Sequence, residues 1–227
     1  YRVRSVSNVI DELEWISENL KVKEVFFEDD TFTISKKRVI EFCGEYRERG
    51  LDIAWACNAR VGLDYETMKT MKKAGCRQFS LGLESFSDHV LSLMRKGYTA
   101  QDAVRFLKAS KEAGIDNHIA IIVGYPGETE EDFNTTLEYI GRNAVYIDRI
   151  CSLNICGMPV GSELRRFPEK YNYFFPPHGD WVTNDHTNTF TVRKRRYNEV
   201  INYCNKLNIP VDACLDLEVF GEQFGKK

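Results

Sequence analysis

An alternation of helix and strand signals runs through most of this 227-residue chain and restricts its fold more than any other feature. Apolar residues first keep helical spacing, then a short turn follows, and then a short apolar run typical of a strand. The expected helices carry apolar residues within 9–20, 39–46, 65–71, 103–107 and 133–140. The expected strands cover residues 23–27, 51–57, 76–83, 115–123 and 148–156. Strands that alternate with helices predict an α/β fold with a parallel sheet.

Glycines and polar residues mark the ends of the expected helices. A left-handed residue commonly closes a helix, and the sequences ERG, KAG and EAG place a glycine there: Gly50, Gly75 and Gly114. Polar residues suited to N-caps precede four helices: Ser35, Asp64, Thr99 and Thr129. Thr99 and Thr129 each stand three residues before an aspartate, which is the spacing of a capping box.

Periodicity alone does not choose between an open doubly wound sheet and a β/α barrel. The run IAIIV at residues 119–123 is apolar at consecutive positions, as expected for a strand buried on both faces. After Cys156 the pattern weakens, and residues 157–192 are predicted to be irregular. A last helix is predicted near residues 194–207.

Charge and composition exclude several classes of protein. The net charge of −3 and the lack of a long basic run disfavour nucleic acid as a partner. The longest apolar stretch, residues 119–123, is far too short for a membrane span. Seven cysteines, an odd number, fall in expected helices and strands, which predicts a reduced, cytoplasmic protein.

Polar residues follow the expected strands directly. Ligands of β/α folds bind at the carboxyl ends of the strands, where carboxylates can bind an ammonium group or ribose hydroxyls. Arg60 could bind a carboxylate there, and the glycines of Gly-Tyr-Pro-Gly-Glu would let a flat ring approach the backbone. Each has a simpler alternative. Asp30 could cap the next helix, Arg60 could form a surface ion pair, and Gly-Tyr-Pro-Gly-Glu suits a turn and helix start without a ligand.

The ordered set VFFEDDTF, WACNARV, FSLGLES, MRKGYT and IIVGYPGETEEDF resembles the radical S-adenosylmethionine (SAM) superfamily. Within it, the chain is most similar to the group that often carries an upstream cobalamin-binding domain and to the methylthiotransferases. The resemblance covers residues 1–164, with a looser match to about residue 207. It implies a partial, TIM-barrel-like parallel β/α barrel of six strands, of which this chain would supply the second to the sixth.

The resemblance also implies a chemistry. Members of the family bind SAM and cleave it reductively with a 4Fe–4S cluster, giving a 5′-deoxyadenosyl radical for oxidoreductase or methyltransferase reactions. An external electron donor is implied, and cobalamin bound by an upstream domain is a further expectation. The substrate, a small molecule or a macromolecule, stays open.

The first two motifs imply SAM contacts for five residues. Glu28, Asp29 and Asp30 occupy the second-strand motif, whose backbone and acids contact the methionine ammonium group. Asn58 and Arg60 follow the third strand, where the family often contacts the ribose or the methionine carboxylate.

The later motifs imply further contacts. Glu84 and Ser85 close the fourth strand, where polar groups meet the ribose and the carboxylate. Lys96 is the basic residue of MRKGYT, often a partner of the SAM carboxylate, and Arg95 is its alternative. The adenine-side loop and the sixth strand correspond to Val123, Gly124, Pro126, Gly127 and Ile155.

The sequence departs from the family because it contains no CxxxCxxC. A cluster needs several convergent thiolates, and Cys57 near a strand end and Cys76 near a strand start are expected at opposite ends of the barrel. We therefore expect the first strand and the cluster loop just upstream of Tyr1. The prediction is a barrel core at residues 1–164 without catalytic or metal-binding residues, inactive alone, and an extension at residues 165–227 packed on it.

Two alternatives remain at this point. The chain could be a degenerate, non-catalytic β/α barrel kept as a scaffold. It could also be an unrelated TIM-barrel enzyme for phosphorylated or carbonyl substrates. That class predicts a glycine-rich phosphate loop late in the barrel or a Schiff-base lysine on a strand, and neither is found, since Lys23 stands at a strand start.

Overall fold

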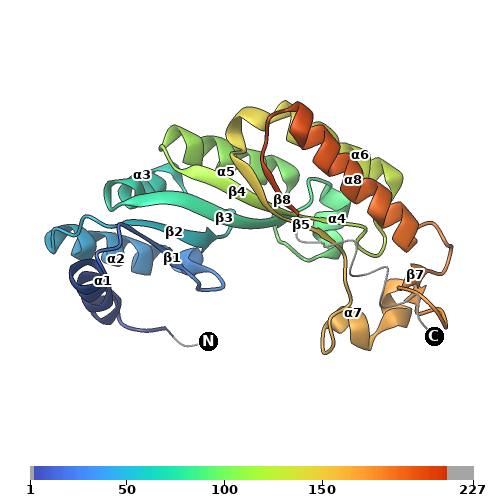
Figure 1. The fold of residues 1–227 in the computed structure, drawn as a ribbon, viewed down its shortest axis with the longest axis horizontal. Coiled ribbons are helices and arrows are strands. Elements are labelled where there is room, and N and C mark those ends of the chain that lie inside the picture. The colour runs from blue at the N-terminus through green and yellow to red at the C-terminus, as the bar shows by residue number, and fades with distance from the viewer. Residues whose placement is uncertain (1–2, 214–227) are drawn as a thin grey trace. The chain divides into compact units, whose positions relative to one another are not determined.

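The computed structural model describes residues 3–213 and shows the predicted alternation of helices and strands (Figure 1). The strands are β1 (Glu24–Phe27), β2 (Ala54–Ala59), β3 (Cys76–Glu84), β4 (Asp116–Val123), β5 (Arg149–Ile155), β6 (Tyr173–Phe174), β7 (Val182–Thr183) and β8 (Val211–Ala213). The α-helices are α1 (Val6–Leu20), α2 (Lys36–Glu48), α3 (Tyr65–Lys73), α4 (Asp88–Leu93), α5 (Ala100–Glu112), α6 (Glu130–Arg142), α7 (Glu163–Arg166) and α8 (Phe190–Lys206). Short 3₁₀ helices lie at Phe32–Ile34, Ala144–Tyr146 and Pro168–Tyr171.

The strand order settles the choice between the two predicted architectures. Six strands of the described chain form a sheet in the order β1-β2-β3-β4-β5-β8, and the pairs β1–β2, β2–β3 and β5–β8 are parallel. A doubly wound sheet reverses its strand order at a switch point, whereas here every new strand is added on the same side. Right-handed crossovers then place successive helices on one face, as in a β/α barrel. The predicted fold class is confirmed, and β8 is a strand that the sequence pattern did not predict.

The described chain divides into two compact units, the first within residues 3–82 and 101–118 and the second within 83–100 and 119–213. In the first unit α1 packs on α2 and α2 on α3. Its core holds four aromatic rings with centroids 4.7–5.7 Å apart: Phe27, Phe32, Phe42 and Trp55. The indole of Trp55 donates to the carbonyl of Ala74 at 2.5 Å, so this buried ring has its polar group satisfied.

In the second unit α8 packs on α6 and on β5. The segment predicted to be irregular contains short elements, including the antiparallel pair β6–β7 and a buried cluster of Cys156, Tyr173 and Trp181. Helix α8 begins at Phe190, four residues before the predicted start, because Thr189 caps it and accepts a hydrogen bond from the amide of Val192 at 3.2 Å. The division at residue 164 stays a prediction, and Cys214 with the rest of 214–227 lies outside the described residues.

The predicted helix boundaries are largely confirmed. Ser35, Asp64 and Thr129 are N-caps, and Thr129 with Asp132 makes both bonds of a capping box. Helix α5 begins directly after Thr99. The three closing glycines have positive φ: +66° at Gly50, +90° at Gly75 and +81° at Gly114.

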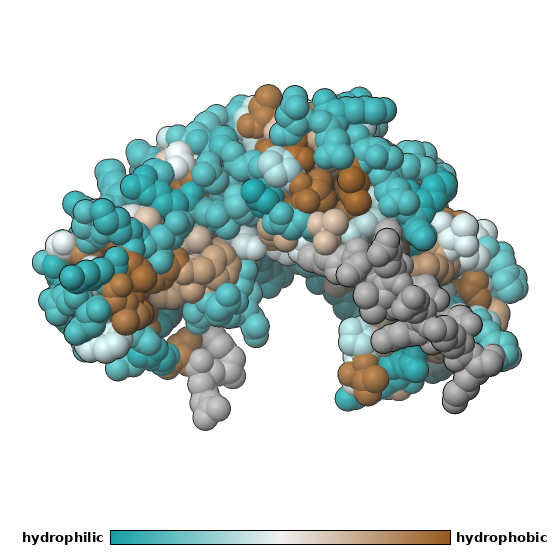
Figure 2. Space-filling view, in the orientation of Figure 1, coloured by the Kyte–Doolittle hydropathy of each residue, from teal (hydrophilic) through white to brown (hydrophobic). Residues whose placement is uncertain are grey.

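The surface carries apolar side chains in separate patches among hydrophilic residues (Figure 2). In the first unit, exposed apolar residues lie on α1 and β1, for example Trp15, Leu20 and Phe26. Such scattered exposure is ordinary for a folded protein. None of the helices formed by residues 3–213 combines the length and the apolar character of a membrane span.

Candidate functional site

The second unit contains a cleft of about 490 Å³ at the carboxyl ends of β3, β4 and β5. Three of the residues predicted to bind SAM line it together. The lining residues are Glu84, Met94, Lys96, Ile122, Tyr125, Asn154, Ile155, Cys156, Gly157, Pro159 and Leu164.

A carboxylate and an ammonium group face each other in this cleft. Glu84 ends β3 with a φ of +72°, and Lys96 follows α4 in a turn that contains Arg95 at +56° and Gly97 at +75°. The Lys96 Nζ and the Glu84 Oε1 are 3.4 Å apart, and the two side chains are 25% and 16% exposed. This is a long, half-buried ion pair, so each group can still bind a ligand of opposite charge.

Two further polar side chains of the cleft are neutral near pH 7. Burial raises the pKa of the Tyr125 phenol to about 12. Burial likewise raises the pKa of the Cys156 thiol to about 12, although Arg193 acts in the opposite direction. Neither group therefore adds charge to the Glu84–Lys96 pair.

Apolar side chains form the remaining walls of the cleft. Ile122 and Ile155 come from β4 and β5. Met94 directly follows α4, and Leu164 lies in α7. An apolar cleft with a few convergent polar groups is typical of a small-molecule site. The arrangement suits a ligand that joins a flat, weakly polar ring to a carboxylate and an ammonium group.

Other predicted residues of the second unit lie away from this cleft. Ser85 is buried, and its hydroxyl hydrogen-bonds Thr136 of α6 at 3.0 Å. Arg95 is 66% exposed and pairs with Glu163. Pro126 and Gly127 line a different cavity, of about 720 Å³.

The loop after β4 is held by polar contacts of its backbone. The Val123 carbonyl accepts a hydrogen bond from the Cys156 amide at 2.9 Å. The Gly124 amide donates to Glu128 Oε2 at 2.6 Å. Gly124 has a φ of +78°, and a Cβ at this position would clash with the side chain of Arg193. The close packing of the Arg193 side chain therefore explains why glycine occupies position 124, and this explanation needs no ligand.

The predicted residues of the first unit lie at the carboxyl ends of β1 and β2, with Asn58 inside β2. Glu28, Asp29 and Asp30 are exposed after β1, and the Asn58 side chain donates to the Asp29 carbonyl at 3.0 Å. The alternative role of Asp30 as a helix cap is wrong, because Ser35 caps α2.

Arg60 directly follows β2. Its amide donates to the Thr33 hydroxyl at 3.0 Å. Together with Thr33, Lys36 and Asp64 it lines a hollow of about 270 Å³ in the first unit.

The described cysteines do not fit an iron–sulfur cluster. Among residues 3–213, no group of three or more cysteine, histidine or acidic side chains is arranged to hold a metal ion. Cluster ligation needs several convergent cysteine side chains.

The prediction that Cys57 and Cys76 lie at opposite ends of the barrel is wrong. Cys76 pairs with Trp55 in the β2–β3 register, two residues from Cys57, and the two thiols hydrogen-bond each other. Burial, followed by this contact, raises the pKa of Cys57 well above its ordinary value. The error arose because β2 begins at Ala54, later than predicted, so that Cys57 lies in mid-strand.

Several cleft residues were not predicted from the sequence, because ligand contacts were expected at the positions that follow each strand. Ile122 and Asn154 lie inside β4 and β5, one position before the last residue of each strand. In β4 buried and half-buried residues alternate, and Ile122 belongs to the half-buried set. The period of two along a strand was therefore the signal that could have identified it.

A singly wound parallel sheet with a polar and apolar cleft at its carboxyl edge defines an α/β protein of the β/α-barrel class. The model of the Radical SAM superfamily matches residues 1–140, more than half of the sequence. This chain therefore belongs to the radical SAM superfamily.

Two relatives of known sequence are similar to this chain. The chain is 36% identical over 140 residues to an uncharacterized methyltransferase of Pyrococcus horikoshii, covering 61% of this chain and 30% of that protein. It is 32% identical over 139 residues to the anaerobic magnesium-protoporphyrin IX monomethyl ester cyclase of Rubrivivax gelatinosus, covering 60% and 25%. The chain thus spans less than a third of the length of either relative.

A solved structure has a similar fold. It is the radical SAM methyltransferase TsrM of Kitasatospora setae, with cobalamin and a 4Fe–4S cluster bound. The TM-score is 0.58 at 21% identity, with 67% of this chain and 28% of TsrM covered. At this identity the likeness establishes the fold alone.

Proposed function

We propose that this chain is the SAM-binding part of a radical SAM enzyme of the oxidoreductase or methyltransferase kind. The observation that carries the proposal is the pairing of Glu84 with Lys96 in a cleft with apolar walls. SAM joins an amino-acid zwitterion to a flat adenine ring, which is the combination of groups that such a cleft suits.

Each side chain of the cleft has a proposed role. The Lys96 ammonium group binds the carboxylate of SAM, and the Glu84 carboxylate accepts hydrogen bonds from its ammonium group or ribose hydroxyls. Ile122 and Ile155 pack against the adenine ring. The contacts assigned by resemblance to the other predicted residues stay predictions.

In the family, the 4Fe–4S cluster supplies the electron that cleaves SAM. Because the described cysteines do not fit this cluster, we derive no step through it and assign no catalytic residue to this chain. Use of cobalamin, an external electron donor and a cytoplasmic location are further predictions. The same lack of fitting cysteines favours a second candidate, a β/α scaffold that does not perform radical chemistry.

Calorimetric titration with SAM tests the proposal. We expect the chain to bind SAM and Lys96→Ala to weaken binding about tenfold or more, because a charge-assisted hydrogen bond is lost. Arg95→Ala is a matched control, since it removes a neighbouring charge that pairs with Glu163 outside the cleft.

The two variants separate the possible outcomes. Loss of affinity in Lys96→Ala but not in Arg95→Ala supports the proposed orientation of SAM. Equal losses would mean that Arg95, the alternative partner of the SAM carboxylate, or general positive charge contributes as much as Lys96. Failure of the unaltered chain to bind SAM would favour the scaffold candidate.

A further inference from the structure

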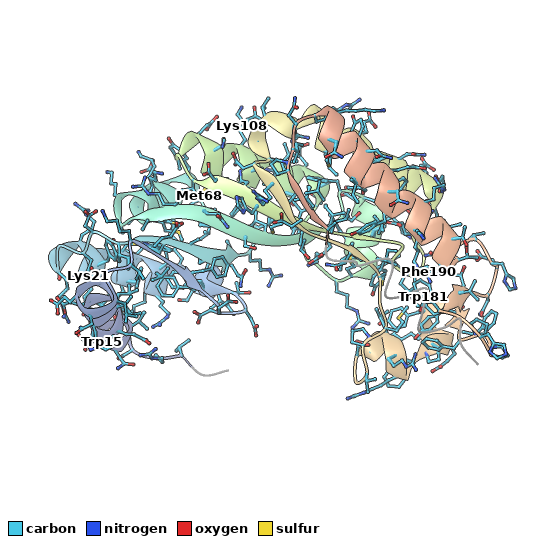
Figure 3. All side chains as sticks on the ribbon, viewed as in Figure 1. Trp15, Lys21, Met68, Lys108, Trp181 and Phe190 are labelled. Carbon is cyan, nitrogen blue, oxygen red and sulfur yellow. The ribbon has the colours of Figure 1, made fainter. Side chains whose placement is uncertain are left out.

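The segment that precedes and begins α8 contacts both loops that border the cleft. Trp181 donates from its indole nitrogen to the Cys156 carbonyl at 2.9 Å, after β5. Asn188 donates from its side-chain amide to the carbonyls of Gly124 at 3.1 Å and Tyr125 at 3.2 Å, after β4. Both side chains are at most 1% exposed. Figure 3 labels Trp181 together with Phe190, the first residue of α8.

Arg193 of α8 holds this segment in place. Its side chain is fully buried, and its guanidinium lies 3.8 Å from the centroid of the Trp181 ring. It donates to the Asn188 carbonyl at 3.0 Å, to Asp180 Oδ2 at 2.8 Å and to the Trp181 carbonyl at 2.8 Å. Asn188 and Trp181 are thus held by one cation while each binds a different loop.

The same arginine packs against the loop after β4 directly. Its Cγ and Cδ occupy the space where a side chain at Gly124 would begin. The arrangement has a cost, because the buried Arg193 Nε has no hydrogen-bond partner among the described residues. An unpaired buried donor lowers stability.

We propose that Asn188 and Arg193 are positioning residues for the ligand cleft. They fix the carbonyls of Gly124 and Tyr125, and through Trp181 that of Cys156, before a ligand arrives. Tyr125 and Cys156 line the cleft, so these bonds set part of its wall. A loop ordered in advance does not lose its freedom when the ligand binds, and affinity rises accordingly. The inference rests on the proposed function, in that the ligand is taken to be SAM.

Hydrogen exchange and SAM titration of Asn188→Asp test this role. The substitution keeps the shape of the side chain but replaces the donor that faces two carbonyls with an acceptor. Two backbone amides report on the loop. The Gly124 amide donates to Glu128 Oε2, and the Glu128 amide donates to the Tyr125 carbonyl. We expect these amides to exchange about tenfold faster and SAM to bind about tenfold more weakly.

Arg195→Ala is the matched control on the same helix. Arg195 is 44% exposed and pairs with Glu130 and Glu199. We expect wild-type exchange at Gly124 and Glu128 and wild-type SAM affinity in this variant. If Asn188→Asp does not fold, Asn188→Ala, which introduces no charge, replaces it in both measurements.

The outcomes distinguish a positioning role of Asn188 from a merely structural contact. Unchanged exchange at Gly124 and Glu128 in the Asn188 variant would overturn the idea that Asn188 holds the loop. Faster exchange with unchanged SAM affinity would mean that Asn188 joins α8 to the loop after β4 without affecting ligand binding. That result would overturn the positioning role. If the unaltered chain does not bind SAM, the proposed function and the positioning role fail together, while exchange still decides whether the loop is held.

Discussion

Replacing Arg196 with leucine should strongly destabilise the second unit. The Arg196 Nη1 and the Glu128 Oε2 are 2.7 Å apart, and the two side chains are only 3% and 2% exposed. The variant leaves the Glu128 carboxylate buried without its counter-charge, because its other partner is the neutral amide of Gly124. Removing one partner of a buried ion pair costs about 3–5 kcal/mol, a large part of the roughly 5–15 kcal/mol that stabilises a typical domain.

The pH dependence gives this prediction a second, independent readout. Burial raises the pKa of Glu128 to about 7 from an ordinary 4.5, although Arg196 acts to lower it. The folded chain therefore holds this proton more tightly than the unfolded chain. The resulting stabilisation is full below about pH 4.5 and declines as the pH rises towards 7. Without Arg196 the pKa should rise further, so Arg196→Leu should continue to lose stability above pH 7.

Urea unfolding followed by circular dichroism measures both effects. The proteins compared are the unaltered chain, Arg196→Leu, the double variant Arg196→Leu/Glu128→Gln and the exposed control Arg195→Leu. The double variant should recover stability mainly above about pH 8, where Glu128 of Arg196→Leu begins to ionise, and should lose the added pH dependence, because no charge stays buried. A cost below about 1 kcal/mol for Arg196→Leu, or no recovery in the double variant, would contradict a stabilising Arg196–Glu128 ion pair.

Two further predictions concern single positions. Burial alone would raise the pKa of Asp132, but hydrogen bonds from Ser87, Thr129 and His89 outweigh it and lower the pKa to about 2. Asp132 should therefore contribute roughly 2 kcal/mol above pH 4, lost as the pH falls towards 2, and acid unfolding of Asp132→Asn should lack this contribution. Gly75→Ala should cost roughly 1–3 kcal/mol more in urea unfolding than Gly50→Ala. A Cβ at Gly75 would lie 2.8 Å from the Tyr46 hydroxyl, whereas nothing lies within 4 Å at Gly50, and equal costs would contradict this account.

The sequence was sufficient for the elements that local physics determines. Apolar spacing, N-caps and closing glycines predicted α1, α2, α3, α5, α6, α8 and five strands, since these signals act within one or two turns of chain. The short helices α4 and α7 and the pair β6–β7 were not predicted. β8 was missed because Val211–Ala213 is too short for a pattern and is a strand only through its pairing with β5. The alternation predicted parallel pairing, but the order of the strands was not readable from periodicity, which leaves the winding of the sheet open.

The candidate site was predictable to the extent that it follows the strand ends. Glu84, Lys96 and Ile155 meet in one cleft, as their motifs suggested. The support behind the cleft was not predictable, because Asn188 contacts Gly124 across 64 positions of sequence. No local pattern at either residue records such a contact, which depends on how α8 packs in the second unit.

The backbone at the cleft supplies an argument that the sequence could not. Glu84 and Arg95 have φ values of +72° and +56°, where residues other than glycine are strained by about 1–2 kcal/mol. Glycine would remove this strain at either position. At Arg95 the strain belongs to the turn after α4, and the side chain points to Glu163 outside the cleft. At Glu84 the strained residue is also the one whose carboxylate faces Lys96 inside the cleft. Strain retained at a residue that lines a cleft is typical of functional positions, so the backbone of Glu84 supports the role proposed above for its carboxylate.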